Sequence, residues 1–303
     1  NTLMQSGNSH ESIVNQTGIE NVASTTQSNN SSDSFLTQTG DNNTGTVTQS
    51  GSFFGGNQFS DLDQIGDGNI ANISQGGNLH DSNVMQTGDR NNTSVNQTNS
   101  GSDSDVIQTG DDNMAGITQS GSGQTSVATQ LGSDNDATVG QSGSGNNSDI
   151  ASTGDGNIAT IAQLGTGNGS DVDQTGDGNT STVTQNGDGN SSMISQLQDD
   201  NEALVLQQNG DDNTSSINQD GMRNEAQVRQ LNGDDNLSTN SQTGDDNWIS
   251  VRQVGAGSHI ASATQTGDDN DISIRQNGTG NNSTVSQDGD DNNSEIHQLG
   301  STN

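Results

Sequence analysis

Hydrophobic and polar residues alternate with a period of two inside short segments that recur about every eleven residues along the chain. Each segment has four specialised positions, here called slots: Asn, then Ala or Ser, then Val or Ile, then Gln. Asn157, Ala159, Ile161 and Gln163 form one copy. Side chains two residues apart in a β-strand point to the same face. The pattern therefore predicts short strands that all turn the same four residue types to one side, and this internal repeat defines the architecture.

The repeat is regular enough to outweigh the composition of the chain. Hydrophobic residues make up 22% of the sequence, aromatic residues 2%, and the net charge is −34, values typical of a disordered protein. However, the third slot is Val, Ile or Leu in 22 of 26 copies, with Thr25, Ala128, Asn240 and Ala263 as exceptions. The fourth slot is Gln in 25 of 26 copies, with Ser152 as the exception. Such periodicity predicts an ordered structure.

The segments between the strands read as turns of the form Gln-x-Gly-x-x-Asn. Gly tolerates a positive φ, so the chain is expected to reverse at these glycines. The turns alternate between acidic and neutral sequences, which predicts a 22-residue coil made of two 11-residue half-repeats, with one acidic edge. Insertions fall in the turns, the largest being four residues around 50–57, which include Phe53 and Phe54. The clearest turn glycines are Gly110, Gly154, Gly176, Gly244 and Gly289.

These features predict an all-β fold, a β-solenoid of stacked two-strand β-arch coils with the cross-β geometry of an amyloid. Successive coils would pair in register about 4.8 Å apart. About 13 coils would form a single domain over residues 1–303. The chain has no proline, so every backbone N–H can take part in the ladder.

Polar ladders are expected to hold the coils together, because Asn and Gln amides each carry donors and an acceptor and can bond to their own copy in the next coil. His10, His80 and His259 occupy the Asn slot and are interpreted as polar substitutes in the ladder. The residues predicted to form the ladders and to support self-assembly are Gln5, Gln16, Asn21, Asn157, Gln163, Asn168, Gln174, Asn281, Gln287, Asn292 and Gln298.

Neither end of the sequence carries a recognisable capping segment. The repeat is already in phase at Leu3, and Asn303 falls where another copy would begin. Solenoids that stay monomeric usually cover their edges. The expectation from the sequence is therefore two bare, matching edges and head-to-tail polymerisation.

The tandem unit Asn-x-Ala/Ser-x-Val/Ile-x-Gln-x-Gly-x-x-Asn, complete in residues 157–174 and 281–298, closely resembles the curlin repeat of curli subunits. The resemblance covers nearly the whole chain. It implies a major fibre subunit of a secreted functional amyloid, which serves biofilm matrix, adhesion and surface colonisation as a curli-like pilus at the cell surface. It also implies a minor curlin nucleator and an outer-membrane secretion pore as partners. The chain has more coils than familiar major curlins, lacks an evident pore-addressing segment, and has no basic terminal repeat of the nucleator kind.

Other functions fit the sequence less well. Five Lys+Arg residues against 39 Asp+Glu exclude an electrostatic nucleic-acid partner, and no run is long enough to insert into a membrane. No catalytic constellation, cofactor motif or metal-ligand spacing is present, so an enzyme is not expected. The alternative is a monomeric extracellular β-solenoid that acts as an adhesin or ligand-binding module. Asp-Asp-Asn turns such as 211–213 suggest calcium, and Thr-x-Thr pairs such as 46–48 suggest ice.

Overall fold

A computed structural model describes residues 1–51 and 57–301 of the chain. The insertion that contains Phe53 and Phe54, and the final Asn303, lie outside the described residues. The described part contains 27 β-strands and no helix. The chain divides into two compact units, Asn1–Ile150 and Ala151–Asn303, which are described in turn.

The strands of the first unit are β1 (Thr2–Asn8), β2 (Glu11–Thr17), β3 (Val22–Asn30), β4 (Asp33–Thr39), β5 (Thr44–Ser50), β6 (Phe59–Ile65), β7 (Ile70–Asn78), β8 (Asp81–Thr87), β9 (Asn92–Ser100), β10 (Asp103–Thr109), β11 (Met114–Ser122), β12 (Thr125–Leu131) and β13 (Asp136–Ser144). Strand β14 (Asn147–Thr153) contains the division at Ile150. The strands of the second unit are β15 (Ile158–Thr166), β16 (Gly169–Thr175), β17 (Thr180–Asn186), β18 (Ser191–Leu197), β19 (Glu202–Gln208), β20 (Thr214–Asp220), β21 (Glu225–Leu231), β22 (Leu237–Thr243), β23 (Trp248–Gly257), β24 (Ile260–Thr266), β25 (Asp271–Thr279), β26 (Asn282–Asp288) and β27 (Asn293–Ser301).

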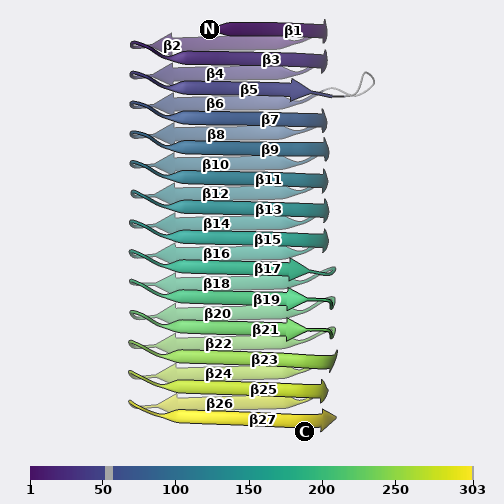
Figure 1. Cartoon of the computed structure of the whole chain (residues 1–303), viewed down its shortest axis with the longest axis vertical. Coiled ribbons are helices and arrows are strands. Elements are labelled where there is room, and N and C mark those ends of the chain that lie inside the picture. Colours follow the sequence, from purple (N-terminus) through teal and green to yellow (C-terminus); the bar gives the residue numbers. More distant parts are fainter. Residues whose placement is uncertain (52–56, 302–303) are drawn as a thin grey trace. The chain divides into compact units, whose positions relative to one another are not determined.

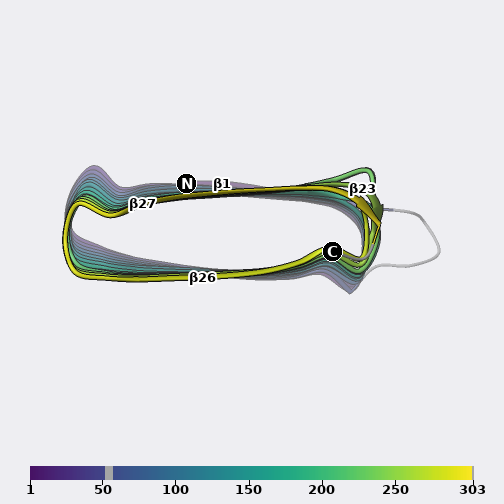
Figure 2. The ribbon, with the colours of Figure 1, turned by 90° about the horizontal axis from the view of Figure 1, so that it is seen from below.

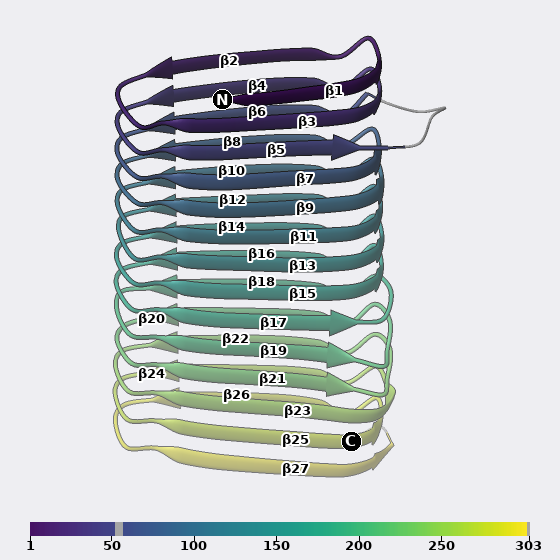
Figure 3. The same cartoon turned by 45° about the horizontal axis from the view of Figure 1, so that its top comes forward.

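In the first unit, odd-numbered and even-numbered strands form two separate parallel sheets. The odd-numbered strands follow one another from β1 to β13, and the even-numbered strands from β2 to β12, so each strand pairs with the strand two places along the chain. Figure 3 shows this alternation. The register is unshifted: Val106 pairs with Val84 on one side and with Ala128 on the other. Each coil therefore places its slots directly against those of its neighbours.

The second unit repeats the arrangement with strands β15 to β27 and β16 to β26. Val183 pairs with Ile161 and Val205, again in register. Figure 1 shows odd-numbered and even-numbered strands running in opposite directions, and Figure 2 shows β26 and β27 on opposite sides of one flattened loop. The prediction of an all-β solenoid with about 13 turns of roughly 22 residues is confirmed. The single domain over residues 1–303 stays a prediction.

The four slots point inward, as expected from their period of two. Val172, Val183 and Ala159 have no exposed side-chain surface, and the Gln and Asn slots are buried beside them. The exceptional residues of the third slot are buried too. Asn240 is the most polar of them: its Nδ2 donates to Ser238 Oγ, whereas its buried Oδ1 has no hydrogen-bond partner among the described residues.

The strands begin one residue later than the sequence pattern suggests. Asn157 and Asn168 were predicted to open their strands, but β15 and β16 start at the residues that follow them. The reason lies in the direction of the Asn hydrogen bonds. The backbone N–H of Asn179 donates to the side-chain Oδ1 of Asn157 over 2.9 Å, so the Asn slot leaves the backbone ladder and becomes the end of the turn.

Conformation favours Gly at all five predicted turn positions, and the close approach of the next coil excludes a side chain at four of them, Gly289 being the exception. Gly110, Gly154, Gly176, Gly244 and Gly289 all have φ between 107° and 116°. A Cβ atom on Gly154 would lie 2.1 Å from the carbonyl oxygen of Gly176 in the next coil. The stacking distance therefore excludes any side chain at this position, in addition to the backbone strain that an L-residue would carry.

Replacing Gly154 by Ala should lower the free energy of unfolding by about 2–4 kcal/mol, because strain and overpacking act together. Gly169→Ala is the matched control: Gly169 lies in a strand with ordinary φ, and a Cβ there meets nothing within 4 Å. Urea denaturation followed by circular dichroism measures both variants. Equal effects of the two substitutions would contradict the close-approach explanation.

Candidate functional site

The buried Gln residues form continuous ladders of side-chain hydrogen bonds. In the second unit, Gln163 Nε2 donates to Gln185 Oε1 over 2.9 Å, and Gln185 Nε2 donates to Gln207 Oε1 over 2.9 Å. The same Nε2 of Gln185 also donates to the carbonyl oxygen of Gly169 over 2.9 Å, on the opposite sheet. Each Gln therefore joins one coil to the next and one sheet to the other, which satisfies an amide that would otherwise be costly to bury.

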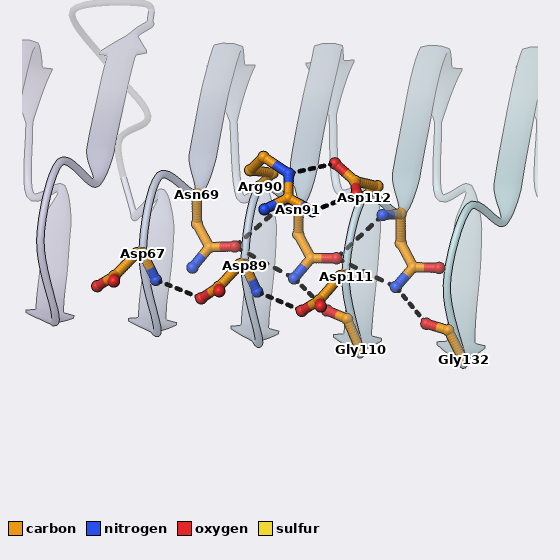
Figure 4. Close-up of polar contacts among 10 residues, drawn as sticks. Asp67, Asn69, Asp89, Arg90, Asn91, Gly110, Asp111, Asp112 and Gly132 are labelled. Atoms are coloured by element: carbon orange, nitrogen blue, oxygen red, sulfur yellow. Dashed lines mark hydrogen bonds and ion pairs between the residues drawn. The ribbon is translucent and has the colours of Figure 1, made fainter.

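The Asn residues form a second ladder at the turns (Figure 4). Asn91 donates from its backbone N–H to Asn69 Oδ1 over 2.9 Å, and from Nδ2 to the same oxygen over 3.1 Å. Its Nδ2 also donates to the carbonyl oxygen of Gly110 over 2.7 Å. One Asn thus contacts the coil before it and the coil after it, and it accounts for the groups freed where the strand ends.

The two ladders have opposite polarity. Along the Gln ladder, the amide N–H of an earlier coil donates to a later coil, as Gln163 does to Gln185. Along the Asn ladder, the later coil donates to the earlier one, as Asn91 does to Asn69. If two successive coils were separated, each of the two surfaces would present both hydrogen-bond donors and acceptors from the ladders. The donors of one surface would match the acceptors of the other.

A third ladder runs through the acidic turns and was missed by the sequence reasoning, which treated the aspartates as turn formers and solubilising charges. Asp67 donates its backbone N–H to Asp89 Oδ1 over 2.8 Å, and Asp89 donates likewise to Asp111 over 2.8 Å (Figure 4). The signal was present, since Asp recurs directly after the turn Gly once per coil. Whether the recurring Asp forms a ladder depends on how the turn orients the backbone N–H of the Asp in the preceding coil. The spacing of residues in the sequence does not give that orientation.

All the ladder residues chosen from the sequence bond to a residue in an adjacent coil. Near the start of the sequence, Gln5 donates to Gln27 over 2.8 Å, and Asn21 accepts from the backbone N–H of Asn43 over 2.9 Å. The remaining pairs are Gln16 with Gln38, Asn157 with Gly176, Gln163 with Gln185, Asn168 with Gly187, Gln174 with Gln196, Asn281 with His259, Gln287 with Gln265, Asn292 with Asn270, and Gln298 with Gln276.

Histidines in the Asn slot reproduce the ladder geometry. His80 Nδ1 accepts the backbone N–H of Ser102 over 3.3 Å, and His259 Nδ1 accepts that of Asn281 over 3.2 Å. Burial lowers the pKa of both imidazoles below their usual value. The neutral form is the one that can accept at Nδ1, so burial and ladder function favour the same protonation state.

Carboxylates gather on the outer surface of the even-numbered sheet in the first unit. Asp61, Asp81 and Asp103, here called the acidic face, project from the successive strands β6, β8 and β10. Partial burial, then the neighbouring Asp63, raises the pKa of Asp61. Partial burial, then repulsion by nearby carboxylates including Asp105, raises the pKa of Asp81 and of Asp103. This surface is therefore an uncompensated cluster of negative charge.

The described residues contain no group of three or more His, Asp or Glu side chains placed so that it could hold a metal ion. Nor do they form a helix with the length and apolar character needed to cross a membrane. The Gln and Asn ladders direct buried amides to neighbouring coils, and this makes the stacking surfaces the chemically distinctive feature of the described residues.

Comparison with known protein families supports this view. The family model described as curlin associated repeat matches residues 110–143, 132–165, 165–197 and 267–300. No curated protein matches the chain. The repeat matches and the solenoid fold together fit a curli-like structural subunit.

Replacing Gln185 by Met keeps the side-chain size but removes three hydrogen bonds, leaving buried partners on Gln163, Gln207 and Gly169. The free energy of unfolding should fall by about 3 kcal/mol, because unsatisfied buried groups lose their solvation. Thr184→Val, at the adjacent outward position, should change it by less than about 0.5 kcal/mol. Chemical denaturation checks both variants, and a neutral Gln185→Met would show that the amide ladder is dispensable.

The acidic face should make stability depend on pH. Because the pKa of Asp81 is raised, its folded form holds a proton more tightly than the unfolded chain, so its contribution is fully present below the unfolded pKa and is lost as pH rises through the folded value. Asp81→Asn should therefore raise the urea midpoint at pH 7 and leave it unchanged at pH 3.

Asp112 provides the opposite case, because its hydrogen bond from Arg90 lowers the pKa of that carboxyl. Asp112→Asn should not raise the midpoint at pH 7. A rise of equal size in both variants would indicate a general effect of net charge instead of local repulsion on the acidic face.

Proposed function

Because the chain is a curlin-repeat protein, we propose that it is a structural subunit that adds head to tail to further copies of itself and so builds an amyloid-like fibre. Each added chain would extend both parallel sheets and the three side-chain ladders. Assembly would then use the same contacts that join successive coils within one molecule.

The observation that carries this proposal is the complementarity of the two surfaces of a coil. Gln163 presents a donor to the coil after it, while Gln207 presents an acceptor to the coil before it, and Gln185 satisfies both. The backbone pairing is parallel and in register across the strands that carry these residues. A coil of a second chain can make the same contacts as the next coil of the same chain. The number of coils that can stack therefore has no intrinsic limit.

Stability of the fibre would follow from its one-dimensional order. An isolated coil has few apolar residues to bury, whereas a stacked coil gains backbone and amide hydrogen bonds on two sides. Addition to an existing end should therefore be much more favourable than association of free chains. This supports a need for seeding, and the family resemblance points to a minor curlin nucleator in that role.

We further propose that assembly takes place outside the cell, after export through an outer-membrane pore, where the fibres serve adhesion, surface colonisation and biofilm matrix. The net charge of −34 would keep single chains apart before assembly. The proposal assigns the chain no catalytic role and no cofactor, because the Gln, Asn and His side chains of the ladders are bonded to neighbouring coils.

Dilution of the denatured full chain into calcium-free buffer tests the proposal. We expect unbranched fibres in electron micrographs, thioflavin fluorescence that rises faster when preformed fibres are added, and a meridional reflection near 4.8 Å. Gln185→Met monomer should add to wild-type seeds more slowly than Thr184→Val monomer, because its own ladder is broken.

A folded monomer that stays monomeric in the presence of seeds would contradict the proposal. Calcium titration and thermal hysteresis would then be measured on that monomer, because the alternative is an extracellular solenoid that binds a ligand.

A further inference from the structure

The chain holds five basic side chains besides histidine, all of them arginines, and they fall into two groups. Arg90 and Arg223 lie in turns, and each pairs with an Asp one coil further along, Asp112 and Asp246. The other three, Arg229, Arg252 and Arg275, lie at the same outward position of β21, β23 and β25 and pair with one another in register. These three residues are called the arginine stripe.

The charge of the arginine stripe is not balanced by ion pairs among the described residues. None of its members forms an ion pair within the described part of the chain. On the same face, Glu225 accepts a hydrogen bond from Gln227, and Glu295 pairs with His297. Asp271 lies four residues before Arg275, about 13 Å along an extended strand. Like charges directly opposite each other in a sheet are destabilising, so a stack of three in an acidic protein indicates a partner that supplies negative charge.

The acidic face has the complementary arrangement. Asp81 pairs in register with Asp103, whereas Asp61, on the preceding strand, is offset by two residues and pairs with Asn83, so each of three successive strands carries one of these carboxylates. The arginines and these carboxylates lie on stacks of parallel strands that share an axial spacing of about 4.8 Å per strand. The axial spacing of the arginines on one molecule therefore matches that of the carboxylates on another, whether the two molecules lie parallel or antiparallel.

Apolar side chains flank both surfaces. Leu231 and Val254 stand at the next outward position beside the arginine stripe and pair in register. Phe59 and Met85, which are 37% and 42% exposed, lie on the same sheet as the acidic face. Contact between the two surfaces would thus bury apolar area in addition to joining opposite charges, and this makes a specific contact more favourable than charge alone.

We propose that the arginine stripe docks on the acidic face of a second copy of the chain, so that solenoids associate side by side as well as end to end. This inference rests on the proposed function, because lateral docking would order neighbouring fibres. Over the rest of the acidic surface, copies repel one another. The stripe therefore selects one lateral contact among many unfavourable ones.

Disulfide trapping tests this contact, since the chain has no cysteine of its own. Ser250→Cys places a thiol beside Arg252, and Asn83→Cys places one beside Asp81, both at outward positions of their strands. One protein carries a size tag, and the two are mixed at low salt under mild oxidation. We expect a mixed disulfide dimer in clear excess over the matched control pair, Ser250→Cys with Thr138→Cys.

Neutralising variants show whether the charges are responsible. In the Ser250→Cys background, R229Q/R252Q/R275Q should lower the yield of mixed dimer by about tenfold, as should D61N/D81N/D103N in the Asn83→Cys background. For the Ser250→Cys and Asn83→Cys pair without neutralising substitutions, sodium chloride at about 1 M should also lower the yield of mixed dimer by about tenfold, because the Debye length is then near 3 Å. R90Q in the Ser250→Cys background is the control for removing an arginine that is paired elsewhere, and it should leave the yield unchanged.

Seeded fibre growth is measured on the same preparations. Fibres that form normally without a mixed dimer above the control would overturn the lateral contact and leave end-to-end assembly intact. A mixed dimer without fibres would support the contact and reject the proposed function. Capture of dextran sulfate by the arginine stripe, without a mixed dimer, would overturn the proposal in favour of a polyanion as the occupant.

Discussion

The structure depends on satisfying buried amides. With 22% hydrophobic residues, the chain cannot build a conventional apolar core, and the interior of each coil is lined largely by Asn and Gln. A buried amide is stable only when its donors and acceptor are bonded. Repetition at a constant register meets that condition for most of the Gln and Asn residues, because each of these finds an identical group one coil away. The parallel sheets and the constant spacing of the four slots within each strand both serve this requirement.

The same requirement explains the chemistry of the turns. Close stacking brings the turn of one coil against the next, so Gly is needed where a Cβ would meet a carbonyl oxygen. Asn and Asp then take up the backbone groups that the reversal leaves free, with hydrogen bonds directed along the stack. An apparently polar and flexible sequence is thus as constrained in its turns as in its strands.

Much of this could be predicted from sequence, because period-two slots and a constant repeat follow from β geometry. The inward slots, the two-strand coil and the Gly turns are properties of that geometry. The predicted start of each strand was one residue too early, because the Asn slot donates its backbone N–H to a side chain, as Asn179 does to Asn157. Residue spacing does not indicate whether a backbone N–H donates to a side chain or to a carbonyl oxygen. The Asp ladder was missed for the same reason. The arginine stripe appears only when strands a coil apart are aligned, since 23 residues separate Arg229 from Arg252.

Asn240 has a mechanical consequence. Its partners in the stack are Ile217 and Ala263, and its buried Oδ1 is not bonded among the described residues, so this rung is held less firmly than its neighbours. In a one-dimensional array, strain concentrates at the weakest interface. In the proposed fibre, shear should therefore sever the stack preferentially there, and each rupture would create two new surfaces able to accept chains. A single polar residue in the third slot would in this way govern how readily fragments multiply.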